Sequence, residues 1–187
     1  SNRMARPREF DPEKALSGAT DIFWRQGYKA TNLPDLLAAM GLTRGSFYKA
    51  FRDKEGVYLR ALDTYDRSVV TPTVSRLDAC DGDNAWSCLA LLFSGPIDDR
   101  RGCFICNAMV ELAPENAAVA EKVNAMAKRI GDAIQRVVER YPSGHSGRSS
   151  HETAELVLHL YFGHQAMGKA GDQGLDWTRQ LRQLIEE

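Results

Sequence analysis

The segment Thr43–Phe51 (Thr-Arg-Gly-Ser-Phe-Tyr-Lys-Ala-Phe) combines cationic, hydroxyl and aromatic side chains at helical spacing. Its periodicity predicts that Arg44, Tyr48 and Lys49 project from one side of a short helix. The other side, predicted to face an earlier helix, carries Phe47, Ala50 and Phe51. Two cations and a phenol on one exposed face suit phosphate groups and base edges. The pattern therefore predicts a surface that binds duplex DNA.

Two residues near this surface stand where helix energetics disfavour them. Gly45, in the first turn of the short helix, costs about 1 kcal/mol of helix stability relative to Ala. Lys54, in the first turn of the next helix, places a cation at the positive end of the macrodipole. A closely approaching DNA backbone explains both. The second helix is capped at Thr31 or Asn32 and the fourth at Asp53, and the N–H groups at their starts add donors for phosphate oxygens.

A Cys-x-x-Cys pair, Cys103 and Cys106, is compatible with redox or metal chemistry. No second Cys pair or spaced His pair completes a tetrahedral site, and no predicted strand precedes the pair. The sequence therefore predicts no metal ion, no cofactor and no catalytic residue, with both cysteines acting as small buried hydrophobes. Two alternatives stay open, a small oxidoreductase or a redox-sensing regulator, with Cys80 or Cys88 as a third participant.

Helices must position these residues, because nearly every segment has helical periodicity and none shows strand-like alternation. Two short helices, at about 31–41 and 43–51, are joined by the tight turn Gly41-Leu42 and form a helix-turn-helix. A first helix spans 11–27, and a fourth starts at Asp53 and kinks or ends near Thr71, since Pro72 lacks an N–H. Five more are predicted at about 85–93, 103–112, 114–141, 149–167 and 175–185. The fold class is all-α, with nine helices.

Composition supports a globular chain: 187 residues, 43% apolar and 26% charged. No apolar run approaches the roughly 18 residues of a membrane span. The net charge is −1, but residues 1–60 carry +4 and residues 61–187 carry −5. A basic N-terminal part on an acidic remainder suggests that only the former meets a polyanion. Four cysteines without dense spacing indicate a reduced compartment, so a cytoplasmic location is predicted.

Gly27-Tyr28, Thr31, Leu33, Leu36, the run from Gly41 to Phe51, and Asp53-Lys54-Glu55 together resemble the N-terminal domain of TetR-family transcriptional regulators. The resemblance covers about residues 10–62. It implies DNA contacts, with Thr43, Tyr48 and Lys54 as phosphate contacts and Arg44, Gly45 and Lys49 near the bases. Ala50, where the family often has His or Tyr, and Leu37, where it often has Ala, depart from the pattern. The full predicted DNA-binding set is Thr31, Thr43, Arg44, Gly45, Ser46, Tyr48, Lys49 and Lys54.

The resemblance further implies two domains, 1–53 for DNA binding and 54–187 for ligand binding and dimerisation. The segment running from Arg101-Gly102-Cys103-Phe104 through Asn107-Ala108 to Glu111 resembles a stretch found in a subset of the family, which names no ligand. Ligand-binding candidates are Trp86, Phe93, Phe104, Asn107, Met109, Met126, His159, Tyr161 and Phe162. Candidates for the dimer interface are Leu156, Leu160, Gly163, Met167, Leu181, Leu184 and Ile185.

The predicted function is a ligand-responsive, non-enzymatic regulator, most simply a repressor. It is expected to bind a palindromic operator in double-stranded DNA as a homodimer and to leave it when a small apolar or aromatic inducer binds. No membrane partner is expected.

Overall fold

The computed structural model describes residues 10–94, 100–142, 147–171 and 175–186, and every regular element in these ranges is a helix. The α-helices are α1 (Pro12–Gln26), α2 (Leu33–Met40), α3 (Arg44–Phe51), α4 (Lys54–Tyr65), α5 (Thr71–Ala79), α6 (Ala85–Leu89), α7 (Phe104–Glu111), α8 (Ala117–Arg140), α9 (Ser150–Lys169) and α10 (Trp177–Glu186). A π-helical turn η1 (Asp66–Val70) and two 3-10 turns, η2 (Ala90–Phe93) and η3 (Ala113–Glu115), complete the list. The all-α class is confirmed. Counting α4, η1 and α5 as one continuous helix gives the expected nine over these ranges.

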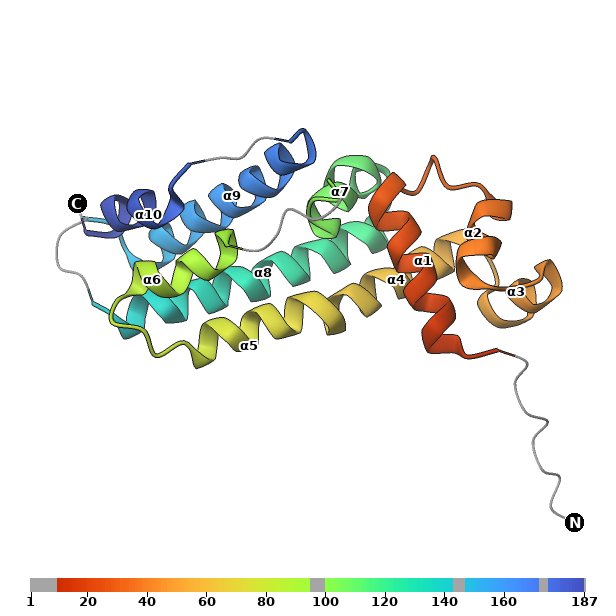
Figure 1. The fold of residues 1–187 in the computed structure, drawn as a ribbon, viewed down its shortest axis with the longest axis horizontal. Coiled ribbons are helices and arrows are strands. Elements are labelled where there is room, and N and C mark those ends of the chain that lie inside the picture. The colour runs from red at the N-terminus through yellow and green to blue at the C-terminus, as the bar shows by residue number, and fades with distance from the viewer. Residues whose placement is uncertain (1–9, 95–99, 143–146, 172–174, 187) are drawn as a thin grey trace, which may run out of the picture.

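The molecule is elongated, with α1, α2 and α3 at one end and α5, α6, α8, α9 and α10 towards the other (Figure 1). We call α1–α3 the head and α5–α10 the body. Helix α4 joins them, because Tyr58 packs edge-on against Phe23 of the head, 5.0 Å between ring centroids, and against Phe104 of the body at 5.6 Å. The predicted division after residue 53 therefore falls at the start of a helix that serves both parts. Residues 1–9 of the first predicted domain and residues 95–99, 143–146, 172–174 and 187 of the second lie outside the described ranges.

Each helix of the head, and α4 after it, begins at a polar residue whose side chain accepts a backbone N–H. Asp11 caps α1, Thr43 caps α3 and Asp53 caps α4. For α2, the sequence left Thr31 and Asn32 as alternatives, and the cap is Asn32, whose Oδ1 accepts from the N–H of Asp35 at 2.9 Å. Each such cap stabilises its helix by about 1 kcal/mol.

Gly18 lets α1 and α2 cross closely. A Cβ at this position would lie 2.0 Å from the carbonyl oxygen of Ala39, a backbone atom that cannot move aside. The crossing buries Phe23, Leu36 and Phe47 completely. The head therefore has a small core of its own that holds α3 at a fixed angle.

Pro72 does not end the helix that starts at Lys54, contrary to one of the two predicted outcomes. The helix continues to Ala79 through the π-helical turn η1, where the N–H of Thr71 bonds the carbonyl of Asp66 five residues back. A π-turn shifts the hydrogen-bond ladder by one residue, which accommodates a residue without an N–H in the first turn of α5. The kink expected near Thr71 thus takes the form of this turn.

Two boundaries in the body differ from the prediction. Pro114 lies in η3, and α8 starts after Asn116, whose side chain accepts the N–H of Val119 at 3.0 Å. Leu175 precedes α10, which begins at Trp177. Pro114 and Leu175 are both exposed, so in each case the predicted helix included a flanking residue that does not pack on the body. Within the described ranges, no helix is long and apolar enough to span a bilayer.

Cys80 and Cys88 form a disulfide that ties the end of α5 to α6. This bond was not predicted, because the sparse spacing of the four cysteines indicated a reduced compartment. Cys103 and Cys106 are free thiols.

Candidate DNA-binding surface

Helix α3 presents a polar face to solvent, as predicted. Arg44 and Lys49 are exposed, and Tyr48 is 50% exposed although its ring is large and mostly apolar. Phe47 and Phe51 are buried on the opposite side and anchor the helix to the head core. Ala50, expected on that buried side, is exposed instead. The face therefore carries two cations and a phenol with no large apolar neighbour other than Tyr48 itself.

The turn before α3 is fixed by backbone and side-chain hydrogen bonds. Gly41 adopts φ +67°, and the N–H of Leu42 bonds the carbonyl of Leu37 at 3.0 Å. The hydroxyl of Thr43 accepts the N–H of Ser46 at 3.2 Å and lies 3.0 Å from the Ser46 hydroxyl. These contacts set the entry angle of α3 and leave the Thr43 hydroxyl exposed at its N-terminus, where the helix dipole favours an anion.

Gly45 has open space around it. A Cβ built there meets no heavy atom within 4 Å, so nothing inside the protein requires glycine at this position. Its φ is also not positive, so the backbone conformation does not require glycine either. The remaining physical reason for glycine is an external surface that comes close to the backbone, as DNA would.

Lys54 lies beside Tyr28, with its Nζ 4.1 Å from the ring centroid. Partial burial lowers the pKa of Lys54, while the nearby Glu111 carboxylate acts in the opposite direction. The ammonium thus has an aromatic partner within the head. The contact between Lys54 and a DNA phosphate stays a prediction.

Thr31 does not share the surface formed by the other predicted DNA contacts. Its side chain is fully buried, and its hydroxyl donates to the carbonyl of Gly27 at 2.6 Å. This bond holds the loop between α1 and α2, so the prediction that the Thr31 side chain is available to DNA is wrong. The burial of Thr31 could not be predicted, because nothing in the sequence distinguishes a buried polar residue beside a helix start from an exposed one.

Most of the predicted ligand residues lie in the interior of the body. Phe93, Phe104, Met126 and Tyr161 are buried, and Trp86, Asn107, Met109 and Phe162 are partly buried. Several of these aromatic rings pack on one another: Phe104 is edge-on to Tyr58 and Tyr65, and Phe93 stacks on Trp177 at 4.6 Å. These contacts are those of a filled core.

Three of the ligand candidates have polar partners within the protein. His159 is exposed and faces solvent, with Nδ1 2.6 Å from the carbonyl oxygen of Glu155 one turn earlier, so its prediction as an interior ligand contact is wrong. The amide of Asn107 donates to the carbonyl of Arg101 at 2.8 Å. Trp86 borders a surface hollow of about 370 Å³ beside Arg140, Tyr141 and Ile185, with its indole N–H donating to Glu186.

The predicted dimer residues divide into two groups. Leu156, Leu160, Gly163 and Met167 form an exposed stripe along one face of α9. Leu181 and Ile185 of α10 are buried within the protomer, and Leu184 is half-buried. Assigning Leu181 and Ile185 to the dimer interface was wrong, because the apolar face of α10 packs on its own body.

Comparison with known proteins identifies a family that shares this arrangement of helices. The family model described as "Bacterial regulatory proteins, tetR family" matches residues 15–61, which run from α1 into α4. Full-length structural similarity decides the assignment: a cysteine mutant of the TetR family transcriptional regulator CifR, complexed with 26bp double-strand operator DNA, matches with a TM-score of 0.76, 26% identity and 96% of each chain covered. The chain belongs to the TetR family. Its head is the family's helix-turn-helix.

Two bacterial relatives are described as HTH-type transcriptional regulators. The HTH-type transcriptional repressor ComR of Escherichia coli (strain K12) is 32% identical over 126 residues, which cover 64% of this chain and 60% of ComR. The uncharacterized HTH-type transcriptional regulator YezE of Bacillus subtilis (strain 168) is 27% identical over 70% of each chain. The match to ComR thus spans less than two thirds of that protein.

The contacts that attach the head to the body were not predicted from the sequence. They involve Trp24, Arg101 and Glu111, which are far apart in the chain. The only signal was the resemblance of the stretch from Arg101 to Glu111 to part of the family, which gave no role for it.

Proposed function

We propose that this TetR-family protein is a transcriptional repressor that binds a palindromic operator as a homodimer and is released by a small inducer. The observation that carries the proposal is the exposed face of α3, where Arg44, Tyr48 and Lys49 surround the open backbone at Gly45. Such a face fits the major groove, with the cations on phosphates and base edges. A bacterial DNA-binding regulator acts in the cytoplasm.

The named relatives support this proposal. CifR is described in complex with operator DNA, and ComR is described as a repressor. One helix-turn-helix reads only one half-site. Two copies related by a twofold axis read two half-sites, which makes specific recognition of an operator possible. The exposed α9 stripe offers the surface for this pairing.

An apolar or aromatic inducer would enter among the buried aromatic rings of the body, such as Phe93, Phe104 and Tyr161. Their dense packing means that the inducer must displace side chains, and α4 touches the same cluster through Tyr58 and Tyr65. Movement of α4 would change the separation of the two heads, and half-site contacts worth about 1–3 kcal/mol each would be lost. Equal head separation with and without inducer would contradict this mechanism.

The test is a selection of genomic DNA fragments with the purified protein at near-physiological salt. A variant with Arg44→Ala, Tyr48→Ala and Lys49→Ala is the matched control, since these exposed side chains contribute little to the core. The wild type is expected to enrich a palindromic site and the variant to enrich none. Equal enrichment by both proteins, or none by either, contradicts the proposal.

Redox sensing is a second candidate, favoured by the Cys80–Cys88 disulfide between α5 and α6. The Cys103 and Cys106 thiols fit this role less well, because burial raises the pKa of both and so lowers the thiolate fraction at neutral pH. Repeating the selection with reduced and with peroxide-treated protein separates the candidates. Unchanged enrichment excludes redox control, whereas a loss on reduction that Cys80→Ser reproduces assigns it to the disulfide. A loss on oxidation that Cys103→Ser prevents assigns it to the Cys-x-x-Cys pair.

A further inference from the structure

The carboxylate of Glu111, at the end of α7, holds the loop that follows α1. Its Oε1 accepts the backbone N–H of Tyr28 at 2.7 Å, and its Oε2 accepts that of Lys29 at 3.1 Å. Charge-assisted bonds of this kind are roughly twice as strong as neutral ones. One body side chain therefore binds two consecutive backbone groups of the head.

Gly27 makes room for this carboxylate. It ends α1 with φ +85°, and a Cβ there would lie 3.0 Å from each oxygen of Glu111. The left-handed turn also aims the two following N–H groups at the same point, as in other backbone anion sites. The loop is thus shaped around the Glu111 carboxylate.

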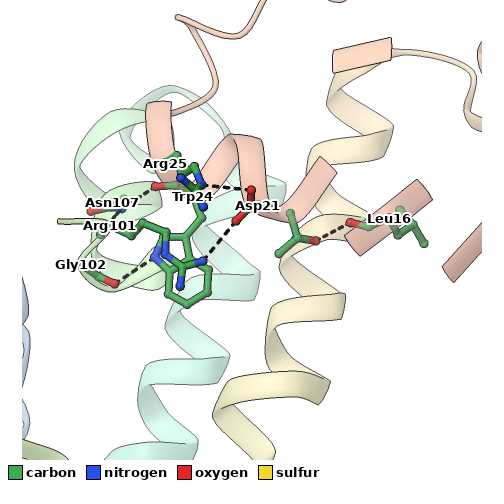
Figure 2. Close-up of polar contacts among 8 residues, drawn as sticks. Leu16, Asp21, Trp24, Arg25, Arg101, Gly102 and Asn107 are labelled. Carbon is green, nitrogen blue, oxygen red and sulfur yellow. Dashed lines mark hydrogen bonds and ion pairs between the residues drawn. The ribbon is translucent and has the colours of Figure 1, made fainter. Parts of the chain in front are cut away.

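A second set of contacts lies one to two turns earlier on α1 (Figure 2). The indole N–H of Trp24 donates to the carbonyl of Gly102 at 2.9 Å. The guanidinium of Arg101 lies 4.0 Å from the Trp24 ring centroid and pairs with Asp21 at 3.2 Å. The carbonyl of Trp24 is also 3.5 Å from the Asn107 amide. Head and body are therefore joined by a cation–π contact and several hydrogen bonds, not by apolar packing alone.

The same body segment is wedged against α9. The Oδ1 of Asn107 accepts from the ammonium of Lys169 at 3.0 Å. At Gly102, where φ is +67°, a Cβ would lie 2.6 Å from the Lys169 side chain and 3.3 Å from the carbonyl oxygen of Gln165. Figure 1 shows α7 between α9 and α1. A displacement of α9 or of residues 101–107 would thus be passed to α1.

We propose that residues 101–111 are the docking element of the body for the head, and that Glu111 is the positioning residue that fixes the head angle. This deepens the proposed function and rests on it for its effect on DNA. Arg101, Gly102 and Glu111, to which the sequence gave no role, all contact the head. Asn107, predicted as a ligand contact, also lies against the carbonyl of Trp24. The head is then held at two points, by α4 and by the docking element.

Two attachment points restrict the head more than α4 alone. Without the Glu111 contact, the head can pivot about the start of α4, and the distance between the two heads of a dimer becomes less defined. Fixed groove spacing makes operator binding sensitive to that distance. Loss of Glu111 is therefore expected to relax the preference for half-site spacing, an effect that general destabilisation does not produce.

The experiment compares wild type, Glu111→Ala, Glu111→Gln and the control Glu115→Gln. Glu115 lies four residues further along the chain and pairs with the Lys29 ammonium at 2.7 Å, so the control removes the same charge beside the same loop without touching its backbone bonds. Exposed pairs of this type contribute little. Thermal melting checks that each variant is folded.

The first readout is hydrogen exchange at the amides of Tyr28 and Lys29. Glu111→Ala is expected to speed their exchange on the order of tenfold, Glu111→Gln less, because its amide keeps one acceptor, and Glu115→Gln hardly at all. Unchanged exchange in Glu111→Ala overturns the proposed docking. This readout needs no DNA, so it decides the docking even if the selection of fragments fails.

The second readout is affinity for the wild-type-selected fragment and for versions with one base pair added or removed between the half-sites. The wild type and Glu115→Gln are expected to keep the same discrimination, and Glu111→Ala to lose about fivefold or more of it. An equal loss of affinity at all spacings in Glu111→Ala overturns the positioning role and leaves Glu111 as a stabilising contact only.

Discussion

Gly45 and Gly18 are glycines for different reasons, and the structure separates them. Around Gly45 the protein leaves open space, whereas a Cβ at Gly18 would meet the backbone of α2 at 2.0 Å. The first glycine is therefore dispensable for folding and the second is not. Helix energetics in the sequence drew attention to Gly45, but the need for Gly18 becomes visible only when α1 and α2 are placed together.

Gly45→Ala is predicted to leave the head as stable or more stable, by up to about 1 kcal/mol, because Ala is the better helix former. The same change is predicted to lower operator affinity, because the added methyl group points at the approaching DNA backbone. Melting temperature and the affinity for the selected fragment measure the two effects. Gly18→Ala is the contrasting variant, expected to cost about 1–3 kcal/mol or more through overpacking. Full operator affinity in Gly45→Ala would mean that α3 does not approach DNA as proposed.

Except for Ala50, the side chains of α3 named in the sequence analysis could be placed from sequence, because helical periodicity alone sorts an exposed from a buried face. Arg44, Lys49 and Phe47 all lie where the spacing put them. Thr31 could not be placed in this way, since its neighbour Asn32 caps equally well. What decides is the Thr31 hydroxyl reaching the carbonyl of Gly27, a contact set by the tertiary path of the loop.

The helices were predictable in number and type, but their partners were not. Both α9 and α10 carry an apolar stripe, and sequence reasoning assigned both stripes to the dimer. The stripe of α10 is buried in its own body, whereas that of α9 remains exposed. Periodicity shows that a helix has an apolar face but not which surface covers it.

The exposed stripe of α9 leads to a prediction about assembly. Leu160, 38% exposed, lies near its middle, so Leu160→Glu is expected to convert the proposed dimer to monomer by placing two like charges in the interface. Sedimentation measures this. Leu91 on η2 is 41% exposed and lies outside the stripe, so Leu91→Glu is the matched control and should stay dimeric. A dimeric Leu160→Glu would move the interface to another surface.

Across the described residues, the fold class and the position of the helix-turn-helix followed from sequence, while the joint between head and body did not. The hydrogen bonds from Trp24 to Gly102 and from Tyr28 to Glu111 join residues about 80 positions apart. No local pattern encodes such pairs, because each partner has an ordinary role in its own helix or loop. The ring contacts within the body, such as those of Phe104 with Tyr58 and of Phe93 with Trp177, were likewise not predicted, and the ligand-binding role of these residues stays a prediction.

Hydroxyl-radical footprinting of the selected DNA fragment tests most directly whether the two heads read DNA together. The wild type is predicted to protect two half-sites related by a twofold axis and centred about 34–36 Å apart, one turn of the duplex. The variant with Arg44→Ala, Tyr48→Ala and Lys49→Ala is predicted to protect neither. Protection of a single half-site, or the same footprint with that variant, would contradict the account of a dimeric regulator that reads DNA through α3.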